Sequence, residues 1–163
     1  MQCKPINENE LEFLSSLISY QFGIDVSKPL EELASDIVVC YGSTGRIRRV
    51  LLGNKLMASL RASDYHIIPY EPLARILHRY TAFPRNRLVL VNEMVLDIVG
   101  RNTIFARHVV ACDYACLPGD EVLVVDELDR LLGVASLRID CETIITAIRG
   151  PAAIARFWCD IGG

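Results

Sequence analysis

Basic side chains able to bind phosphate are concentrated in one stretch of this 163-residue chain. Residues 41–90 carry nine Lys and Arg against two Asp and Glu, a net +7, whereas residues 1–40 and 91–163 each carry a net −5. Eight of the nine are Arg, whose planar guanidinium binds phosphate through two parallel hydrogen bonds and stacks on bases. They are Arg46, Arg48, Arg49, Lys55, Arg61, Arg75, Arg79, Arg85 and Arg87. The pattern predicts a local RNA-binding surface on a chain of net charge −3, and a solvated basic face without a ligand is the alternative.

Other kinds of chemistry find little support in the sequence. Of the six cysteines only Cys112 and Cys116 are close together, and the three histidines are not placed to complete a metal site, so we expect no bound metal. Buried, reduced thiols are the expectation; an internal disulfide is the alternative, with no pair indicated. No nucleophile elbow, phosphate loop or dinucleotide loop is present, so we expect neither an enzyme nor a cofactor.

The composition is that of a folded globular protein, 52% hydrophobic and 23% charged, with room for one medium or two small domains. No stretch approaches the roughly 20 apolar residues of a membrane span. The acidic start MQCKPINENE does not resemble a signal peptide. We therefore expect a cytoplasmic protein that does not bind membranes.

The first half of the chain predicts a small α/β arrangement. Apolar spacing indicates a helix over residues 8–20, stopped by Gly23, and a short helix PLEELA followed by a strand DIVVCYG. A hairpin RIRRVLL-GN-KLMASLR comes next. Strict alternation would place Arg46, Arg48 and Val50 on one face and Arg49 on the other, which favours Arg46 and Arg48 as RNA ligands.

A strand YHIIP and a helix EPLARILHRY follow, and they lead to the expected domain boundary. Arg75 and Arg79 share one face of that helix, one turn apart. The inward-facing residues are expected to be Leu73, Ile76, Leu77 and Tyr80. The helix breaker Pro84 in TAFPRNR divides the chain into domains 1–86 and 87–163.

From residue 87 onward short strands alternate with two small helices. The expected strands are RLVLV, TIFARHVVA, EVLVVDE, LLGVASLRI and PAAIARFW, and the expected helices are NEMVLDIV, with Asn92 as its N-cap, and CETIITAI. Such a series predicts a compact mixed barrel. The fold class is thus α+β: a small α/β domain followed by a mixed β-barrel with two short helices.

The segment GRNTIFARHVVACDYACLPGDEVLVVDELDRLLGVASL resembles a PUA domain, an RNA-binding β-barrel. It matches the pattern G-x-x-V-F-A-x-x-V-x-x-x-D-x-x-x-x-P-G-D-E-V-x-V-V-D-E at most positions, including Phe105, Ala106 and Pro118. Upstream, ISYQFG, TGRIRRV and LMASLRASD resemble the domain that precedes PUA in archaeal tRNA-guanine transglycosylase and archaeosine synthase. The resemblance covers about residues 15–158 and implies a C-terminal region without the catalytic domain.

The resemblance implies a non-catalytic protein that binds the acceptor stem and 3′ end of tRNA, or another structured RNA, in tRNA modification, ribosome biogenesis or translation. The groove residues it implies are Gly100, Arg101, Asn102, Arg107, Arg149 and Arg156, beside the basic set Arg46, Arg48, Arg61, Arg75, Arg79, Arg85 and Arg87. We expect Arg107 and His108 to alternate in one strand, with Arg107 facing the groove. The alternative function is a protein-interaction module or an accessory subunit of a separately encoded tRNA-modifying enzyme.

Overall fold

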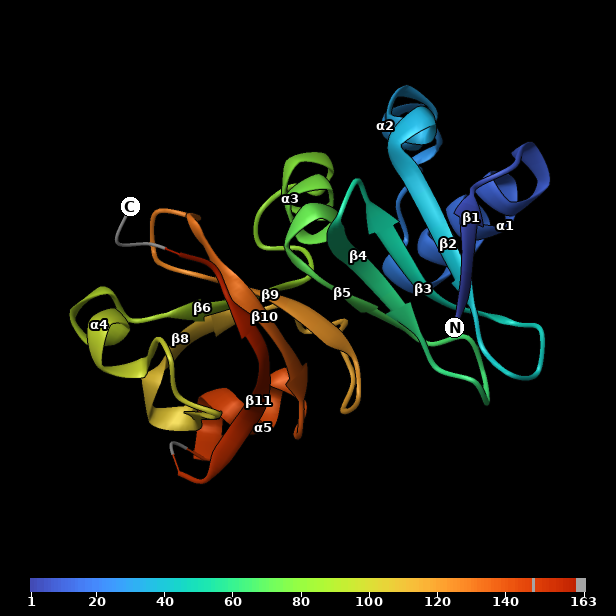
Figure 1. The fold of residues 1–163 in the computed structure, drawn as a ribbon. Helices are drawn as coiled ribbons and strands as arrows, with labels where there is room; N and C mark the ends of the chain where they lie inside the picture. Colours follow the sequence, from blue (N-terminus) through green and yellow to red (C-terminus); the bar gives the residue numbers. More distant parts are fainter. Residues whose placement is uncertain (148, 161–163) are drawn as a thin grey trace. The chain divides into compact units, whose positions relative to one another are not determined.

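The structure is a computed structural model that describes residues 1–147 and 149–160. It divides into two compact units, an N-terminal unit Met1–Tyr80 and a C-terminal unit Thr81–Gly163 (Figure 1). Residues 81–86, which we expected to close the first domain, belong to the second unit in this division. Each unit has a β-sheet of its own.

An antiparallel five-stranded sheet, with the order β1-β2-β3-β4-β5, is the framework of the N-terminal unit. Its strands are β1 (Gln2–Pro5), β2 (Ile37–Tyr41), β3 (Ile47–Leu52), β4 (Lys55–Leu60) and β5 (Ile67–Pro69). The last four confirm the predicted strand, hairpin and short strand. β1 was not predicted, because its four residues are all exposed and lack the apolar alternation that identifies a strand in a sequence.

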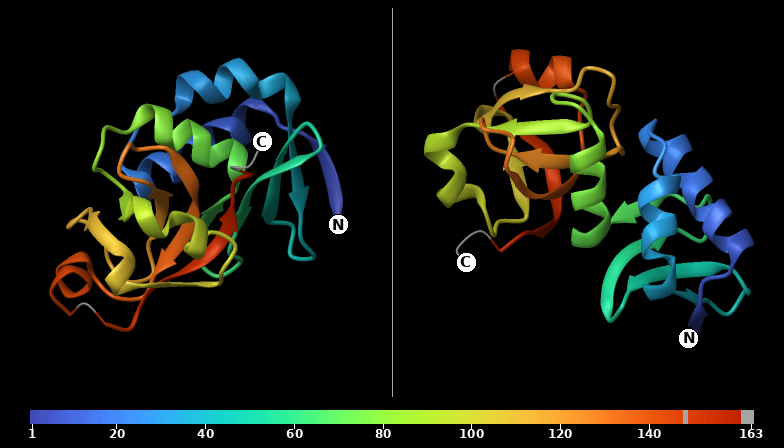
Figure 2. Two further views of the ribbon diagram at one scale, coloured as in Figure 1. Left: turned by 90° about the vertical axis from the view of Figure 1, so that its left-hand side faces the viewer. Right: turned by 90° about the horizontal axis from the view of Figure 1, so that it is seen from above.

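Three helices pack with this sheet: α1 (Glu8–Phe22), α2 (Ser27–Leu33) and α3 (Glu71–Tyr80). α1 begins at a capping box, in which Asn7 Oδ1 accepts a hydrogen bond from the Glu10 backbone N–H and the Glu10 carboxylate accepts one from the Asn7 N–H. It ends at Gly23, where φ is +69°, as the sequence predicted. α1 and α2 lie side by side in both views of Figure 2.

α3 confirms the predicted helix EPLARILHRY, with one correction. Leu73, Ala74 and Leu77 are buried against the sheet. Tyr80, expected to face inward, is 43% exposed. It is the last helical residue, and its ring with a polar tip lies at the surface.

A β-bulge in β3 decides which arginines share a face. The register between β2 and β3 shifts at this point and leaves Arg48 as an extra residue. Because the bulge breaks the alternation, Ile47 and Val50 are both buried although they are three residues apart. The predicted grouping of Arg46 and Arg48 with Val50 is therefore wrong. Arg49 is exposed, is paired in register with Ser59, and lies on the open face.

Rows of paired residues separate a buried face of this sheet from an open one. Val39, Val50 and Ala58 are paired across three strands and are at most 1% exposed. The adjacent row, which points the other way, is Arg49, Ser59 and Ile68. None of these three is fully buried, so this face of the sheet is available to a ligand.

The C-terminal unit is a strongly curved six-stranded sheet with the order β7-β11-β10-β9-β6-β8 (Figures 1 and 2). Its strands are β6 (Arg87–Leu90), β7 (Thr103–Phe105), β8 (Val109–Cys112), β9 (Glu121–Val125), β10 (Leu131–Leu137) and β11 (Pro151–Trp158). β6 and β9 are parallel, and the other pairs are antiparallel. Every residue of β9 and β10 is buried, which confirms the predicted compact mixed barrel.

The small helices of this unit are α4 (Val95–Ile98), preceded by a 3₁₀ turn (Asn92–Met94), and α5 (Cys141–Ala147). Asn92 does not cap the first helix, contrary to our prediction. Its Oδ1 accepts a hydrogen bond from the Glu127 N–H at 3.0 Å, and its own N–H donates to Glu127 Oε2 at 2.8 Å. Ile148, the last residue of the second predicted helix, lies outside the described residues.

The predicted continuous strand TIFARHVVA is two strands. A 3₁₀ turn (Ala106–His108) interrupts it, so that β7 pairs with β11 while β8 pairs with β6 at the other end of the strand order. Arg107 and His108 therefore belong to a turn, and the alternation expected for them does not apply.

Two disulfide bonds correct the expectation of six reduced thiols. The pairs are Cys3–Cys40, which joins β1 to β2, and Cys112–Cys141, which joins β8 to α5. Cys116 and Cys159 are buried and take part in no disulfide bond. Burial raises the pKa of the Cys116 thiol to about 12, so it stays protonated and unreactive at neutral pH.

Candidate nucleic-acid interface

A hollow of about 380 Å³ opens on the exposed face of the N-terminal sheet. We call it the arginine hollow, because Arg48, Arg49 and Arg61 all contribute to its lining. The rest of the lining is mainly apolar, with Leu56 and Ile68 from neighbouring strands. Met1, Ser59, Leu60 and Tyr70 complete the lining.

The three arginines of this hollow are held to different degrees. Arg48 Nε donates to the backbone carbonyl of Leu60 at 3.1 Å. Arg61 forms a bidentate pair with Asp64, at 2.8 and 2.7 Å, which lowers the pKa of that carboxyl well below its usual range. Arg49 is exposed and has no acidic partner among the described residues, so its guanidinium is available to an incoming anion.

Arg46 lies close to the hollow without lining it. Its guanidinium donates to the Ala62 carbonyl at 3.0 Å and lies 5.5 Å from the centre of the Tyr65 ring. Both contacts fix the side chain while leaving several N–H groups exposed. Of the hairpin arginines, sequence reasoning favoured Arg46 and Arg48 and passed over Arg49, because the bulge has no signature in the sequence.

Arg75 and Arg79 share a face of α3, as the sequence predicted, and both are exposed. Arg75 is paired with Glu71 at 2.8 Å, which neutralises much of its charge. Arg79 has no acidic partner in the part of the chain that the structure describes. Both side chains line a smaller hollow of about 240 Å³ next to Leu33 of α2.

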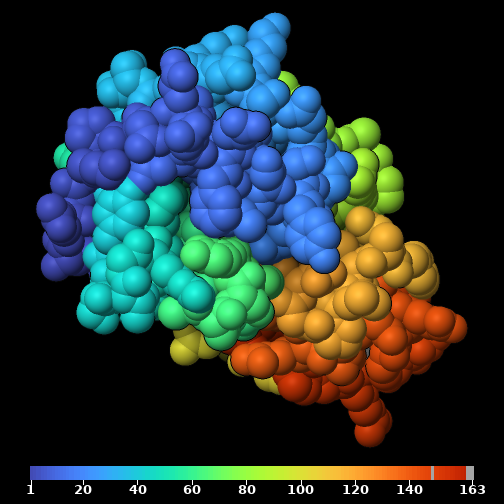
Figure 3. Space-filling model, turned by 90° about the vertical axis from the view of Figure 1, so that its right-hand side faces the viewer, coloured from blue at the N-terminus to red at the C-terminus, as the bar shows by residue number. Residues whose placement is uncertain are grey.

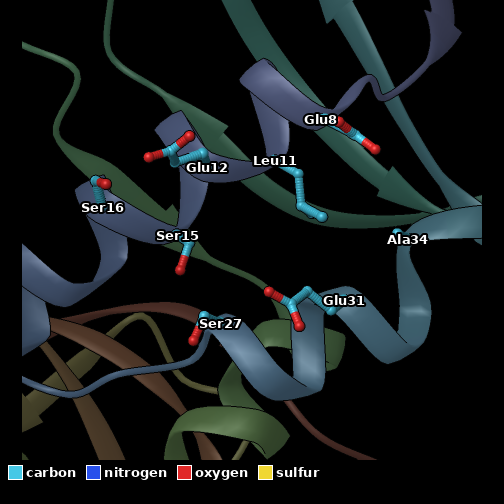
Figure 4. Close-up of a pocket in the computed structure, with 8 residues that line it drawn as sticks. All are labelled: Glu8, Leu11, Glu12, Ser15, Ser16, Ser27, Glu31 and Ala34. Atoms are coloured by element: carbon cyan, nitrogen blue, oxygen red, sulfur yellow. The ribbon is translucent and has the colours of Figure 1, made fainter.

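An acidic hollow of about 670 Å³ lies between α1 and α2. Figure 4 shows the carboxylates of Glu8, Glu12 and Glu31 around it, together with the hydroxyls of Ser15, Ser16 and Ser27. In the space-filling view of Figure 3, α1 and α2 (blue) form a large part of the surface of this unit. An acidic hollow of this kind repels phosphate, so RNA is not expected here.

In the C-terminal unit, backbone hydrogen bonds gather the residues implied by the family resemblance. The Arg101 carbonyl accepts from Trp158 Nε1 at 2.9 Å, and the Asn102 carbonyl accepts from a backbone N–H of β11 at 2.8 Å. The Gly150 carbonyl accepts from Ala106 N–H at 2.9 Å. Segments 100–102, 106–107 and 149–150 are thereby joined along β7 and β11.

Gly100 is the first residue of this edge, and its φ is positive, a backbone conformation that favours glycine. Its φ is +92°, and it directly follows Val99, the C-cap of α4, so it turns the chain from the helix into the edge segment. Arg101, Asn102 and Arg149 are exposed there, and neither arginine has an acidic partner among residues 1–147 and 149–160.

Arg107 is oriented by two neighbours. Its guanidinium lies 5.1 Å from the Phe105 ring centre, and its Nε donates to His108 Nε2 at 3.3 Å. Burial, with Arg107 and Arg101 nearby, lowers the pKa of His108, and Asp97 opposes that shift. A neutral imidazole can accept this hydrogen bond, so Phe105 and His108 hold an exposed Arg107 in place.

Arg87 is not a ligand, contrary to our prediction, because its guanidinium is 1% exposed. It donates to the side chain and backbone carbonyl of Thr81 and to the carbonyl of Arg85, and pairs with Asp129 at 3.1 Å. Arg85 is exposed, and its role as a ligand stays a prediction. Of the basic residues in segment 41–90, Arg87 is thus the one that is buried.

Arg156 is also largely structural. It pairs with the fully buried carboxylate of Glu121 at 2.8 Å and is itself 35% exposed. Removing it would leave a buried charge without this partner, so its main role is to satisfy that carboxylate.

Within residues 1–147 and 149–160, no group of three or more His, Cys, Asp or Glu residues is arranged to hold a metal ion. Over the same residues, no helix is both long and apolar enough to cross a membrane.

Family models assign both units. Residues 12–84 match the patch-forming domain C2 of tRNA-guanine transglycosylase, and residues 86–157 match the PUA domain. The chain is a C2 domain followed by a PUA domain. Both parts of the resemblance seen in the sequence are thereby confirmed.

The C2 and PUA domains together are similar to the tRNA-guanine(15) transglycosylases of Methanococcus vannielii, 30% identical over 156 residues, and Pyrococcus abyssi, 31% identical over 153. The alignments cover 95% and 94% of this chain but 23% and 26% of those proteins. The chain thus spans about a quarter of the length of the curated relatives it matches.

Solved structures confirm the fold of the C2 and PUA domains. A conserved PUA domain protein from Thermoplasma acidophilum has a TM-score of 0.69 at 19% identity and covers 98% of this chain and 95% of its own. A PUA domain structure from Aeropyrum pernix K1 has a TM-score of 0.64 at 11% identity, with coverages of 96% and 85%.

Proposed function

We propose that this chain binds RNA without catalysing a reaction, and that its RNA is tRNA. The observation that carries the proposal is that both domains match the C-terminal region of enzymes named for their action on tRNA. The PUA domain would hold the acceptor stem and 3′ end, and the C2 domain would contact a further part of the same RNA.

The distribution of unpaired arginines supports this proposal. Exposed arginines that have no acidic partner among the described residues include Arg49, Arg79, Arg101, Arg107 and Arg149. Phosphate contacts supply much of the affinity of proteins for nucleic acids, and a local patch provides them even on a chain of net charge −3. The proposed interface also includes Gly100, Asn102, Arg46, Arg48, Arg61, Arg75 and Arg85.

The proposed role is to present tRNA to a separately encoded modifying enzyme in the cytoplasm, as in the formation of archaeosine. No catalytic group is assigned to this chain, so modification of the bound RNA requires that partner. The chain would contribute affinity and orientation.

Binding of the purified protein to folded tRNA, with and without its 3′ CCA, over a salt series tests this function. We expect submicromolar binding at low salt, weakened when CCA is removed and when Arg101→Glu and Arg107→Glu are combined. Lys28→Glu, a charge reversal on the exposed surface of α2, is the control that should leave affinity unchanged. Absence of tRNA binding at low salt would refute the proposal.

The acidic hollow between α1 and α2 supports a second candidate function, a protein-interaction module. A stoichiometric protein partner that remains bound after nuclease treatment would favour this function. Small RNA that copurifies with the chain would favour the first.

A further inference from the structure

The geometry of the C2 domain points to a specific ligand: we infer that the arginine hollow binds one unpaired nucleotide. This inference rests on the proposed RNA-binding function and goes beyond it, because it distinguishes a single-stranded ligand from the backbone of a duplex. It also assigns a role to Arg49, Ser59 and Tyr70, which sequence reasoning did not single out.

The hollow is built on a regular sheet surface. Arg49, Ser59 and Ile68 are paired across β3, β4 and β5, so their side chains point to the same face. Neighbouring strands are about 4.8 Å apart, so a charged, a small polar and an apolar side chain lie one after another across the three strands, over about 10 Å. Ser59 has the smallest side chain of the three, and its small size leaves the space between its neighbours open.

The lining of the hollow combines charge with apolar surface. The backbone of an RNA duplex offers phosphates and sugars, for which arginines alone are sufficient. Leu56, Ile68 and the Tyr70 ring would gain nothing from such a ligand. An unpaired base has two apolar faces, and proteins that bind single strands stack them on flat side chains within a basic groove. A volume of about 380 Å³ lies at the lower end of the range for small-ligand pockets.

The arginines are partly preorganised to hold the phosphate of such a nucleotide. The hydrogen bond from Arg48 Nε to the Leu60 carbonyl and the pair between Arg61 and Asp64 fix two guanidinium groups on the hollow before any ligand arrives. Arg49, which also lines the hollow, has no acidic partner among the described residues. Preorganised donors lose less conformational freedom on binding.

A substitution that fills the hollow without changing its charge distinguishes an unpaired nucleotide from the backbone of a duplex as its ligand. Ser59→Phe should occupy the space for the base while every arginine is kept. Ser16→Phe is the matched control, since it places the same ring in the acidic hollow on α1. Fluorescence anisotropy would be measured with labelled pentaadenylate and with an RNA duplex of about 12 base pairs, in chains that also carry Arg101→Glu and Arg107→Glu to reduce binding by the PUA domain.

We expect Ser59→Phe to weaken pentaadenylate binding at least about tenfold, the effect of losing one stacked base, with duplex binding changed less than twofold. Arg49→Gln, which removes a phosphate contact without adding bulk, should weaken binding of both RNAs. For pentaadenylate, the slope of log K against log salt concentration should become about 0.7 less negative. Arg49→Gln also tests the inference if Ser59→Phe does not fold. If the hollow does not bind single-stranded RNA, pentaadenylate binding should be unchanged in Arg49→Gln.

Equal binding of pentaadenylate by Ser59→Phe and Ser16→Phe would overturn the inference, as would a parallel loss of duplex and single strand in Ser59→Phe. In either case the proposed function stands as long as the wild-type chain binds folded tRNA. A wild-type chain that binds neither tRNA, duplex nor pentaadenylate would overturn both.

Discussion

The two domains present their sheets to a ligand in different ways. In the C2 domain β3 and β4 have one buried and one open face, and arginines occupy the open one. In the PUA domain β9 and β10 are buried at every residue, so charged side chains can reach solvent only at the ends and edges of the curved sheet. The C2 domain therefore offers a surface, whereas the PUA domain offers an edge formed by segments 100–102, 106–107 and 149–150.

Arginines have different roles in the two domains because the two sheets differ in burial. A curved sheet with buried strands also encloses charged groups, and these need partners: Asp129 neutralises the buried Arg87, and Arg156 neutralises the buried Glu121. In the C2 domain the ion pairs of Arg61 and Arg75 are exposed, and such pairs contribute little to stability. The number of arginines in a segment is thus a poor guide to its RNA surface unless their burial is known.

The largest expected effect is that of Arg87→Met, which tests whether arginine is structural in the PUA domain. Loss of the guanidinium leaves the Thr81 hydroxyl, the Thr81 carbonyl and the Arg85 carbonyl without this donor. The cost should be about 3–5 kcal/mol in the free energy of unfolding, since each buried polar group that loses its partner costs about 1–3 kcal/mol. Urea unfolding followed by the fluorescence of Trp158, the single tryptophan, reports it. Arg79→Met should stay within about 0.5 kcal/mol of wild type. A loss below about 1 kcal/mol for Arg87→Met would contradict the structural role.

Removing each disulfide in turn should show how the loss of stability depends on whether the substituted cysteine is exposed or buried. They close segments with sequence separations of 37 and 29 residues, so each should contribute about 2–4 kcal/mol under oxidising conditions. Cys112→Ser should cost more than Cys3→Ser, because Cys112 is buried in the core and Cys3 is exposed. Thermal unfolding of both variants checks the order. An unchanged stability of Cys3→Ser would show that this bond does not form in solution.

Charge reversal should rank the two domains by their share of tRNA affinity. Replacing Arg46, Arg48, Arg75 and Arg79 of the C2 domain with Glu should reduce affinity more than about 100-fold, because four phosphate contacts are lost. Arg101→Glu with Arg107→Glu in the PUA domain should reduce it at least about tenfold. Filter binding over a salt series measures both. Unchanged binding in the quadruple variant would remove the C2 domain from the interface.

The smallest expected effect concerns pH. Since the folded state lowers the pKa of His108, the unfolded chain binds the proton more tightly, and stability should fall as the pH drops below the usual imidazole pKa of about 6.5. His108→Gln removes this contribution. The difference in unfolding midpoint between pH 7.5 and 5.5 should therefore be smaller in His108→Gln than in wild type. An identical difference in both proteins would mean that His108 is not responsible.

Much of the fold was predictable because its signals are local. The capped helix α1, the turn at Gly53 and the glycine at position 100 follow from residue type and spacing. The PUA edge was predictable only through resemblance to a family. The arginine hollow was not predictable, since the bulge at Arg48 arises from pairing with β2 and reverses the face of every residue before it. The burial of Arg87 likewise depends on Asp129, 42 residues away.

Both edges of the C2 sheet end in proline. β1 closes with Pro5 and the three-residue β5 with Pro69, and proline has no N–H to donate to another strand. Short edge strands that contain proline discourage the addition of a strand from a second molecule. Both edges of this sheet therefore disfavour edge-to-edge pairing with another copy of the chain.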